Sequence, residues 1–175
     1  MKKGNTTKMI LAALFLAFGI LLPIIFHTVN LAGDIFLPMH IPVMLCGFIC
    51  GSMWGGVVGI FVVFLSSAIT GMPPLYPVAL FMACELATYG IVCGLFRKVL
   101  NPIVTLIIAM ICGRLVLGIV QYFLLTGSSQ PFVLNTFITS AFVTAIPGII
   151  VQLILVPIII IALKKARLIP IGERS

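Results

Sequence analysis

Apolar runs long enough to cross a lipid bilayer follow one another along almost the whole chain. A spanning helix needs about 20 mostly apolar residues, because the hydrocarbon core is about 30 Å thick and a helix rises about 1.5 Å per residue. Of the 175 residues, 62% are hydrophobic and 7% are charged, whereas a soluble domain carries about 25% charged residues. The sequence therefore predicts an all-α integral membrane protein built as a bundle of helices.

Glycine, proline and short polar segments divide the apolar sequence into six predicted spans. These helices are expected at residues 9–26, 39–52, 54–70, 75–96, 102–125 and 138–163. The second and third runs are together too long for one span, so the chain must break between Gly51 and Gly56, where a short or re-entrant element is the alternative. No small-residue cleavage pattern follows the first helix, which is expected to be retained. The chain is predicted to form a single transmembrane domain over residues 1–175.

Basic residues predict the orientation, because Lys and Arg are retained in cytoplasmic loops. In a six-span bundle, three basic groups fall on one side: before the first helix, between the fourth and fifth, and after the sixth. Their members are Lys2, Lys3, Lys8, Arg97, Lys98, Lys164, Lys165, Arg167 and Arg174. The opposite loops, at 27–38, 71–74 and 126–137, contain no Lys or Arg. Both termini are thus predicted to be cytoplasmic, and the net charge of +7 indicates contact with anionic lipid rather than nucleic acid.

Two formal charges fall inside the predicted spans, Glu85 in the fourth helix and Arg114 in the fifth. An ionised side chain at that depth is costly unless it is paired or faces a wet cavity. One interpretation is a structural ion pair that fixes the two helices. The other is that one or both side chains line a substrate cavity, since ionisable residues in membrane spans are generally functional. The two are compatible, because a pair can open to admit a polar ligand.

A second polar group gathers at the predicted non-cytoplasmic ends of the helices. Its members are Asp34, His40, Tyr76, Gln121, Tyr122, Asn135 and Thr139. Each residue alone fits interfacial anchoring or helix capping. As a set, they predict a small-molecule pocket open to the outside, closed by the segment Thr70–Pro77 and by the first and third outer loops.

Enzymatic activity has no visible residues to carry it. No GxSxG, HExxH or Walker A pattern occurs in the chain. The five cysteines lie within apolar runs, form no CxxC pair, and fit small core residues better than a disulfide frame or a metal site. They are Cys46, Cys50, Cys84, Cys93 and Cys112. The sequence therefore predicts neither a metal nor a cofactor.

Small residues recur at one-turn spacing. Ala13 and Ala17 form such a pair in the first helix. The next two helices repeat the spacing in two glycine pairs, Gly47 with Gly51 and Gly55 with Gly59. Small faces let helices approach closely in lipid. Packing within the bundle and docking onto another subunit both fit this pattern.

With these features, the chain resembles the substrate-binding S components of energy-coupling factor (ECF) vitamin transporters. The resemblance rests on the chain length, on six spans with both termini inside, on the Ala13 and Ala17 pair, and on the segments Leu14–Ile20 and His40–Met44. It covers essentially the whole chain. It implies a multi-pass protein of the prokaryotic plasma membrane that binds one vitamin or precursor tightly from outside. Its partners would be a transmembrane coupling subunit and two cytoplasmic ATPases, which would supply the ATP hydrolysis.

The resemblance also implies roles for particular residues. Ala13 and Ala17 would form the docking surface for the coupling subunit, and the S component would topple in the membrane to carry its ligand across. The first two helices are most similar to members assigned to pyridoxine or hydroxymethylpyrimidine, whose hydroxyls or ring nitrogen could hydrogen-bond to Glu85. Arg114 would equally suit a carboxylate ligand such as pantothenate or nicotinate.

Two other classes of function stand beside this one. A small self-sufficient secondary transporter would normally show internal repeats and ion-coupling residues, and residues 1–87 and 88–175 show no convincing repeat. A structural or assembly subunit would leave the outer polar group without a use.

The predicted topology can be tested by labelling single cysteines, introduced into a variant without the native cysteines, in intact cells. A membrane-impermeant thiol reagent should label positions 30–36 and 127–134 from outside, and should leave the loop Arg97–Asn101 unlabelled. Labelling of the Arg97–Asn101 loop from outside would overturn the six-span arrangement.

Overall fold

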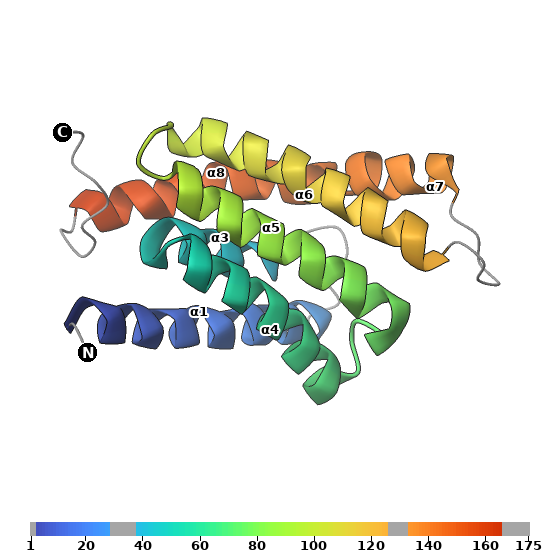
Figure 1. The fold of residues 1–175 in the computed structure, drawn as a ribbon, viewed down its shortest axis with the longest axis horizontal. Coiled ribbons are helices and arrows are strands. Elements are labelled where there is room, and N and C mark those ends of the chain that lie inside the picture. The colour runs from blue at the N-terminus through green and yellow to red at the C-terminus, as the bar shows by residue number, and fades with distance from the viewer. Residues whose placement is uncertain (1–2, 29–37, 126–132, 166–175) are drawn as a thin grey trace.

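The computed structural model describes residues 3–28, 38–125 and 133–165, and the regular elements in these ranges are helical (Figure 1). The longer helices are α1 (Lys3–Thr28), α3 (His40–Cys50), α4 (Ser52–Thr70), α5 (Leu80–Phe96), α6 (Pro102–Leu125) and α8 (Ile146–Lys165). The shorter elements are α7 (Leu134–Ile138) and two π-helical turns, η1 (Leu75–Ala79) and η2 (Thr139–Thr144). The α1 helix lies along one edge of the bundle and α6 and α8 along the other, with α3, α4 and α5 between them (Figure 1).

Within the described ranges, five helical segments are long and apolar enough to cross a membrane, and the predicted all-helical membrane fold is confirmed to that extent. These are Asn5–Phe26, Ser52–Thr70, Leu75–Phe96, Pro102–Leu125 and Ile146–Leu163. The α3 helix is shorter, at 11 residues. The start of α1 and the end of α8 lie at the same end of the bundle (Figure 1). A sixth full span and the cytoplasmic orientation of that end stay predictions.

Backbone chemistry explains where the helices break. The chain turns between α3 and α4 at Gly51, within the predicted interval, with φ of 105° and ψ of 174°. A positive φ of this kind is readily reached only by glycine. The helix expected at 138–163 is instead interrupted, and α8 begins at Ile146. Its second residue, Pro147, lacks a backbone N–H and fits the first turn of a helix, where that donor has no partner in the helix.

Glycines bring α4 and α5 into close contact. A Cβ placed on Gly59 of α4 would lie 2.6 Å from the carbonyl oxygen of Leu86 in α5, and one on Gly55 would lie 2.6 Å from the carbonyl oxygen of Gly90. Such distances leave no room for a side chain, so the two backbones touch directly. The Gly55 and Gly59 pair therefore packs within the bundle, which fixes the position of α5 and of the polar residues on it.

The end of α3 is also held by α5. The Arg97 side chain, at the end of α5, donates from Nη1 to the carbonyl oxygens of Phe48 at 3.3 Å and Ile49 at 3.0 Å. These carbonyls belong to the last turn of α3, where no backbone donor follows in the helix. At about 1.5 Å per residue, the 11 residues of α3 extend about 16 Å from this end. Its first residue, His40, therefore lies about 16 Å from that end, which corresponds to about half of a hydrocarbon core of about 30 Å.

Candidate substrate-binding site

Four buried side chains from three helices meet inside the bundle. Glu85 on α5 pairs with Arg114 on α6, with 2.9 Å between Glu85 Oε1 and Arg114 Nη1. The Tyr89 hydroxyl donates to the same Oε1 at 2.7 Å. On the other side, His40 Nε2 lies 3.9 Å from Glu85 Oε2, and the His40 and Tyr89 ring centroids are 5.3 Å apart. We call His40, Glu85, Tyr89 and Arg114 the polar cluster.

The charged residues of the polar cluster lie near the middle of the candidate spans that carry them. Glu85 precedes Phe96, the last residue of α5, by 11 residues, which corresponds to about 16 Å along the helix. Arg114 follows Pro102, the first residue of α6, by 12 residues, or about 18 Å. Together with His40 at the start of α3, these values agree with half of a core about 30 Å thick. The cluster is therefore far from either aqueous surface along the helix axes.

Several polar atoms of this layer have no partner in the described protein. Both ring nitrogens of His40 are buried without a hydrogen bond, although the residue is 1% exposed. Gln152 on α8 is 2% exposed, and its Nε2 is also buried without a partner. It lies 11 residues, or about 16 Å, before Leu163, the last residue of the candidate span on α8. Buried polar atoms are normally paired, and leaving one unpaired costs about 1 to 3 kcal/mol. Such atoms are what a polar ligand or bound water would satisfy.

The electrostatics of the cluster define what it can recognise. Arg114 and the Tyr89 hydroxyl both engage Glu85 Oε1, so the second carboxylate oxygen, Oε2, faces His40 beyond hydrogen-bond distance. This leaves one anionic acceptor and one imidazole side by side. They suit a ligand with hydroxyl or ring N–H donors and a ring-nitrogen acceptor. Within the described ranges, no group of three or more His, Cys, Asp or Glu side chains could hold a metal ion.

The structure brings three of the predicted binding residues together, namely His40, Glu85 and Arg114. The sequence placed His40 with the outer ends of the helices, and that placement is wrong: as the first residue of a half-length helix, it lies deep in the bundle. Two of the other residues that the sequence predicted for the binding site lie at the surface, whereas the polar cluster is buried. Tyr76 is 64% exposed and Tyr122 is 53% exposed.

The other predicted outer residues in the described ranges are not members of the buried cluster either. Gln121 is half-buried near the end of α6, and Asn135 and Thr139 are exposed at α7 and η2. The Thr139 hydroxyl donates to the backbone oxygen of Asn135 at 2.8 Å, within its own helical turn. Asp34 lies outside the described residues. An outer pocket formed by these residues stays a prediction.

Ala13 and Ala17 are exposed on α1, whereas Ala12 is buried against the bundle. The contact of α1 with α4 runs instead through Gly19, where an added Cβ would lie 3.6 Å from Cβ of Val62. The small face at Ala13 and Ala17 is thus not used for packing within the described part of the chain. It is available to another protein or to lipid.

Sequence reasoning missed two members of the buried layer, Tyr89 and Gln152. Tyr89 follows Glu85 by four residues, so helical periodicity alone puts both side chains on one face of α5. Gln152 is a polar residue inside a strongly apolar run, which is itself a functional signal in a membrane span. Residue spacing and local composition are therefore sufficient to find both residues.

These features define a multi-pass helical membrane protein that encloses a polar cluster at mid-depth, as small-molecule transport subunits do. A family model described as "ECF transporter, substrate-specific component" matches residues 7–160. The chain therefore belongs to this family, whose members bind a small substrate, work with the ECF module and are not catalytic subunits. Comparisons with curated proteins and with solved structures give no match.

The hydrogen bond from Tyr89 can be tested by removing one atom. Tyr89→Phe should lower the free energy of unfolding by about 1.5 to 3 kcal/mol, because the lost bond is made to a charged, buried carboxylate. The matched control is Tyr76→Phe, at a residue 64% exposed, which should change stability by less than about 0.5 kcal/mol. Unfolding of the purified protein in detergent measures both. Equal stability of the two variants would contradict the geometry of the cluster.

Proposed function

We propose that this chain is the high-affinity substrate-binding S component of an ECF-type ABC importer for a water-soluble vitamin or precursor. The substrate is vitamin B6, as pyridoxine or pyridoxal, or hydroxymethylpyrimidine. The observation that carries this proposal is the polar cluster, in which Glu85 Oε2 and His40 Nε2 lie 3.9 Å apart and neither is hydrogen-bonded to the other. A substrate-specific subunit needs such polar atoms, because they are where specificity for a polar ligand arises.

The geometry favours a hydroxylated aromatic ring over a carboxylate ligand. Arg114 is already engaged by Glu85 at 2.9 Å, so a ligand carboxylate would have to displace Glu85 or lie beside a second negative charge. Like charges at a shared buried site are unfavourable. A pyridine or pyrimidine ring with hydroxymethyl groups can instead donate to Glu85 Oε2 and leave the ion pair intact. Pantothenate or another carboxylate vitamin is the second candidate, and it would require Arg114 to change partner.

Two other functions are weaker. A self-sufficient secondary transporter would need ion-coupling groups, and the charged pair in the described spans is already neutralised internally. A structural subunit would gain nothing from the unpaired nitrogens of His40 and Gln152, which destabilise a bundle that binds no ligand. Substrate binding gives these atoms a use.

The proposed partners are a transmembrane coupling subunit and two cytoplasmic ATPases, in the plasma membrane of a prokaryote. Docking would use the exposed small face at Ala13 and Ala17 on α1. Two alanines one turn apart let a partner helix approach the backbone closely, with no long side chains to clear first. The two ATPase subunits would then hydrolyse ATP and supply the energy for uptake.

The choice of substrate predicts which charge matters for affinity. Equilibrium binding of a panel of B vitamins to the purified protein should show binding of pyridoxine or hydroxymethylpyrimidine and none of pantothenate or nicotinate. Glu85→Gln should cost about 2 to 5 kcal/mol of affinity, or at least about 30-fold in Kd, because it removes the charge-assisted hydrogen bond. Arg114→Gln should cost much less.

The reverse order of the two losses would favour a carboxylate ligand. The double variant Glu85→Gln with Arg114→Gln separates folding from binding, since removal of one partner of a buried pair leaves the other uncompensated. If both single variants misfold while the double variant folds and binds normally, the pair is structural and does not contact the substrate.

Docking through α1 predicts a loss of uptake without a loss of binding. Ala13→Trp or Ala17→Trp should abolish uptake in cells, because a bulky ring separates the two helices, while the isolated protein retains its ligand affinity. Leu115→Trp, at an α6 residue that is 61% exposed, is the matched control and should leave both properties unchanged. An equal loss of uptake and binding in the Ala13 and Ala17 variants would show that this face packs within the subunit.

A further inference from the structure

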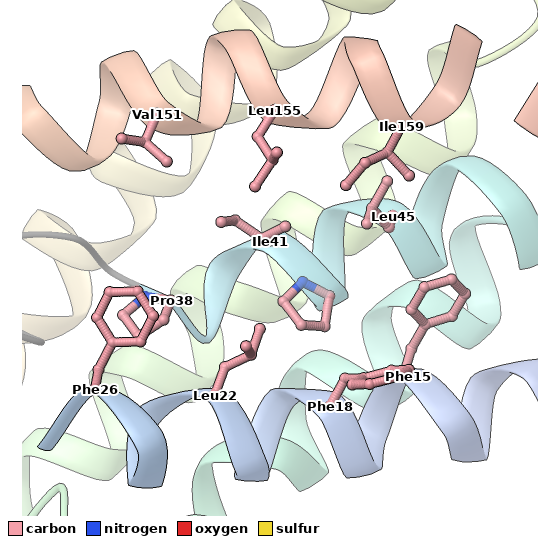
Figure 2. Close-up of a pocket in the computed structure, with 11 residues that line it drawn as sticks. Phe15, Phe18, Leu22, Phe26, Pro38, Ile41, Leu45, Val151, Leu155 and Ile159 are labelled. Carbon is pink, nitrogen blue, oxygen red and sulfur yellow. The ribbon is translucent and has the colours of Figure 1, made fainter. Parts of the chain in front are cut away.

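An apolar groove runs between α1 and α8, with α3 as its floor (Figure 2). Its volume is about 320 Å³, and its lining contains only apolar residues. One wall is formed by side chains of α1, including Phe15 and Phe18, and the other by Leu155 and Ile159 of α8 (Figure 2). The groove is distinct from the polar cluster, since it shares no residue with it. A water-soluble vitamin would find no hydrogen-bonding partner there.

Basic side chains stand at one end of this groove. Lys8 precedes Phe15 by seven residues on α1, and Lys165 follows Ile159 by six residues on α8. At about 1.5 Å per residue, both lysines lie about 10 Å beyond the groove. Figure 1 shows that the start of α1 and the end of α8 lie at the same end of the bundle. Each of the two helices that wall the groove thus carries a lysine beyond the same end of the groove.

We propose that the groove binds an acyl chain of an anionic phospholipid whose headgroup lies between Lys8 and Lys165. One leaflet accounts for about 15 Å of a hydrocarbon core of about 30 Å. A chain that begins at the level of the lysines therefore reaches about 10 Å to Phe15 and Ile159, and then continues past Phe18 and Leu155. Lysine side chains extend along apolar surface to place their charge at the headgroups. The headgroup charge and the apolar chain are each matched by this part of the protein.

The lipid site is separate from the proposed docking face. Phe15 lies two residues from both Ala13 and Ala17, which is about 200° around a helix of about 3.6 residues per turn. Ala13 and Ala17 thus face away from the groove. A lipid in the groove leaves the small face open, so the two sites can be tested independently of each other and of vitamin binding.

Lipid retention by the purified full-length chain tests the proposal. Native mass spectrometry after reconstitution with phosphatidylglycerol or phosphatidylcholine counts lipids bound to the protein. Leu155→Trp should lower retention of both lipids about fivefold, because the added ring fills the groove. The control is Ile154→Trp on the same helix, at a residue 56% exposed that does not line the groove, and it should retain lipid like the unchanged protein.

A second experiment tests the position of the lipid headgroup with variants that remove lysine charges. Lys8→Gln combined with Lys165→Gln should lower the preference for phosphatidylglycerol over phosphatidylcholine about tenfold, with phosphatidylcholine retention unchanged. Lys98→Gln, at the loop between α5 and α6, is the control and should not change the preference. These variants alter surface charge alone, so they answer the question even if Leu155→Trp fails to fold.

Three outcomes would overturn the proposal. Equal retention by the Leu155→Trp and Ile154→Trp variants would show that lipid does not occupy the groove. An unchanged lipid preference after removal of both lysines would show that the headgroup lies elsewhere. A dimer that is lost in the Leu155→Trp variant, without a change in bound lipid, would assign the groove to a second copy of the chain.

Discussion

The ion pair between Glu85 and Arg114 is the interaction on which the interior of this bundle depends. Each charge alone would be strongly unfavourable at mid-membrane, and pairing at 2.9 Å with a further hydrogen bond from Tyr89 makes their burial tolerable. Because the two charges come from different helices, the pair also sets the register of α5 against α6. The packing of Tyr89 follows from it: a Cβ on Gly113 of α6 would lie 2.6 Å from Cδ1 of the Tyr89 ring, so only glycine leaves space for the ring there. With Arg114 and the Tyr89 hydroxyl both on Oε1, the second carboxylate oxygen, Oε2, faces His40.

Helix length decides where that ligand can be reached. The 11 residues of α3 cover about half of the hydrocarbon thickness, so His40 stands at the depth of the pair and not at a surface. Glycine contacts join α4 to α5, and a Cβ on Gly47 of α3 would collide with the carbonyl oxygen of Gly90, so α3 also packs directly against α5. The resulting site is built entirely on regular helices, which position side chains more rigidly than loops do.

The sequence predicted the all-helical membrane fold, a break between Gly51 and Gly56, and the position of Glu85 and Arg114 near the middle of their helices, because apolar run length and buried charge are local signals. It could not predict that His40 joins them, since the position of α3 depends on distant contacts such as that of Arg97 with Phe48 and Ile49. Pro147 is compatible with a kink inside the span expected at 138–163, whereas the structure places it in the first turn of α8, which begins at Ile146. Tyr89 and Gln152, by contrast, could have been identified from residue spacing and local composition. Binding by the outer residues Tyr76 and Tyr122 stays a prediction.

Arg97 shows that one residue can serve two unrelated requirements. In the sequence it counts toward the charge asymmetry between loops, the signal from which orientation is inferred. In the structure its guanidinium satisfies carbonyls at the end of α3, a backbone requirement that would exist in either orientation. Loop charges in compact membrane subunits are thus not independent indicators of topology. A substitution that reverses the charge of such a loop also frays the helix beside it, and the two effects on insertion and on folding would appear together in any mutational screen.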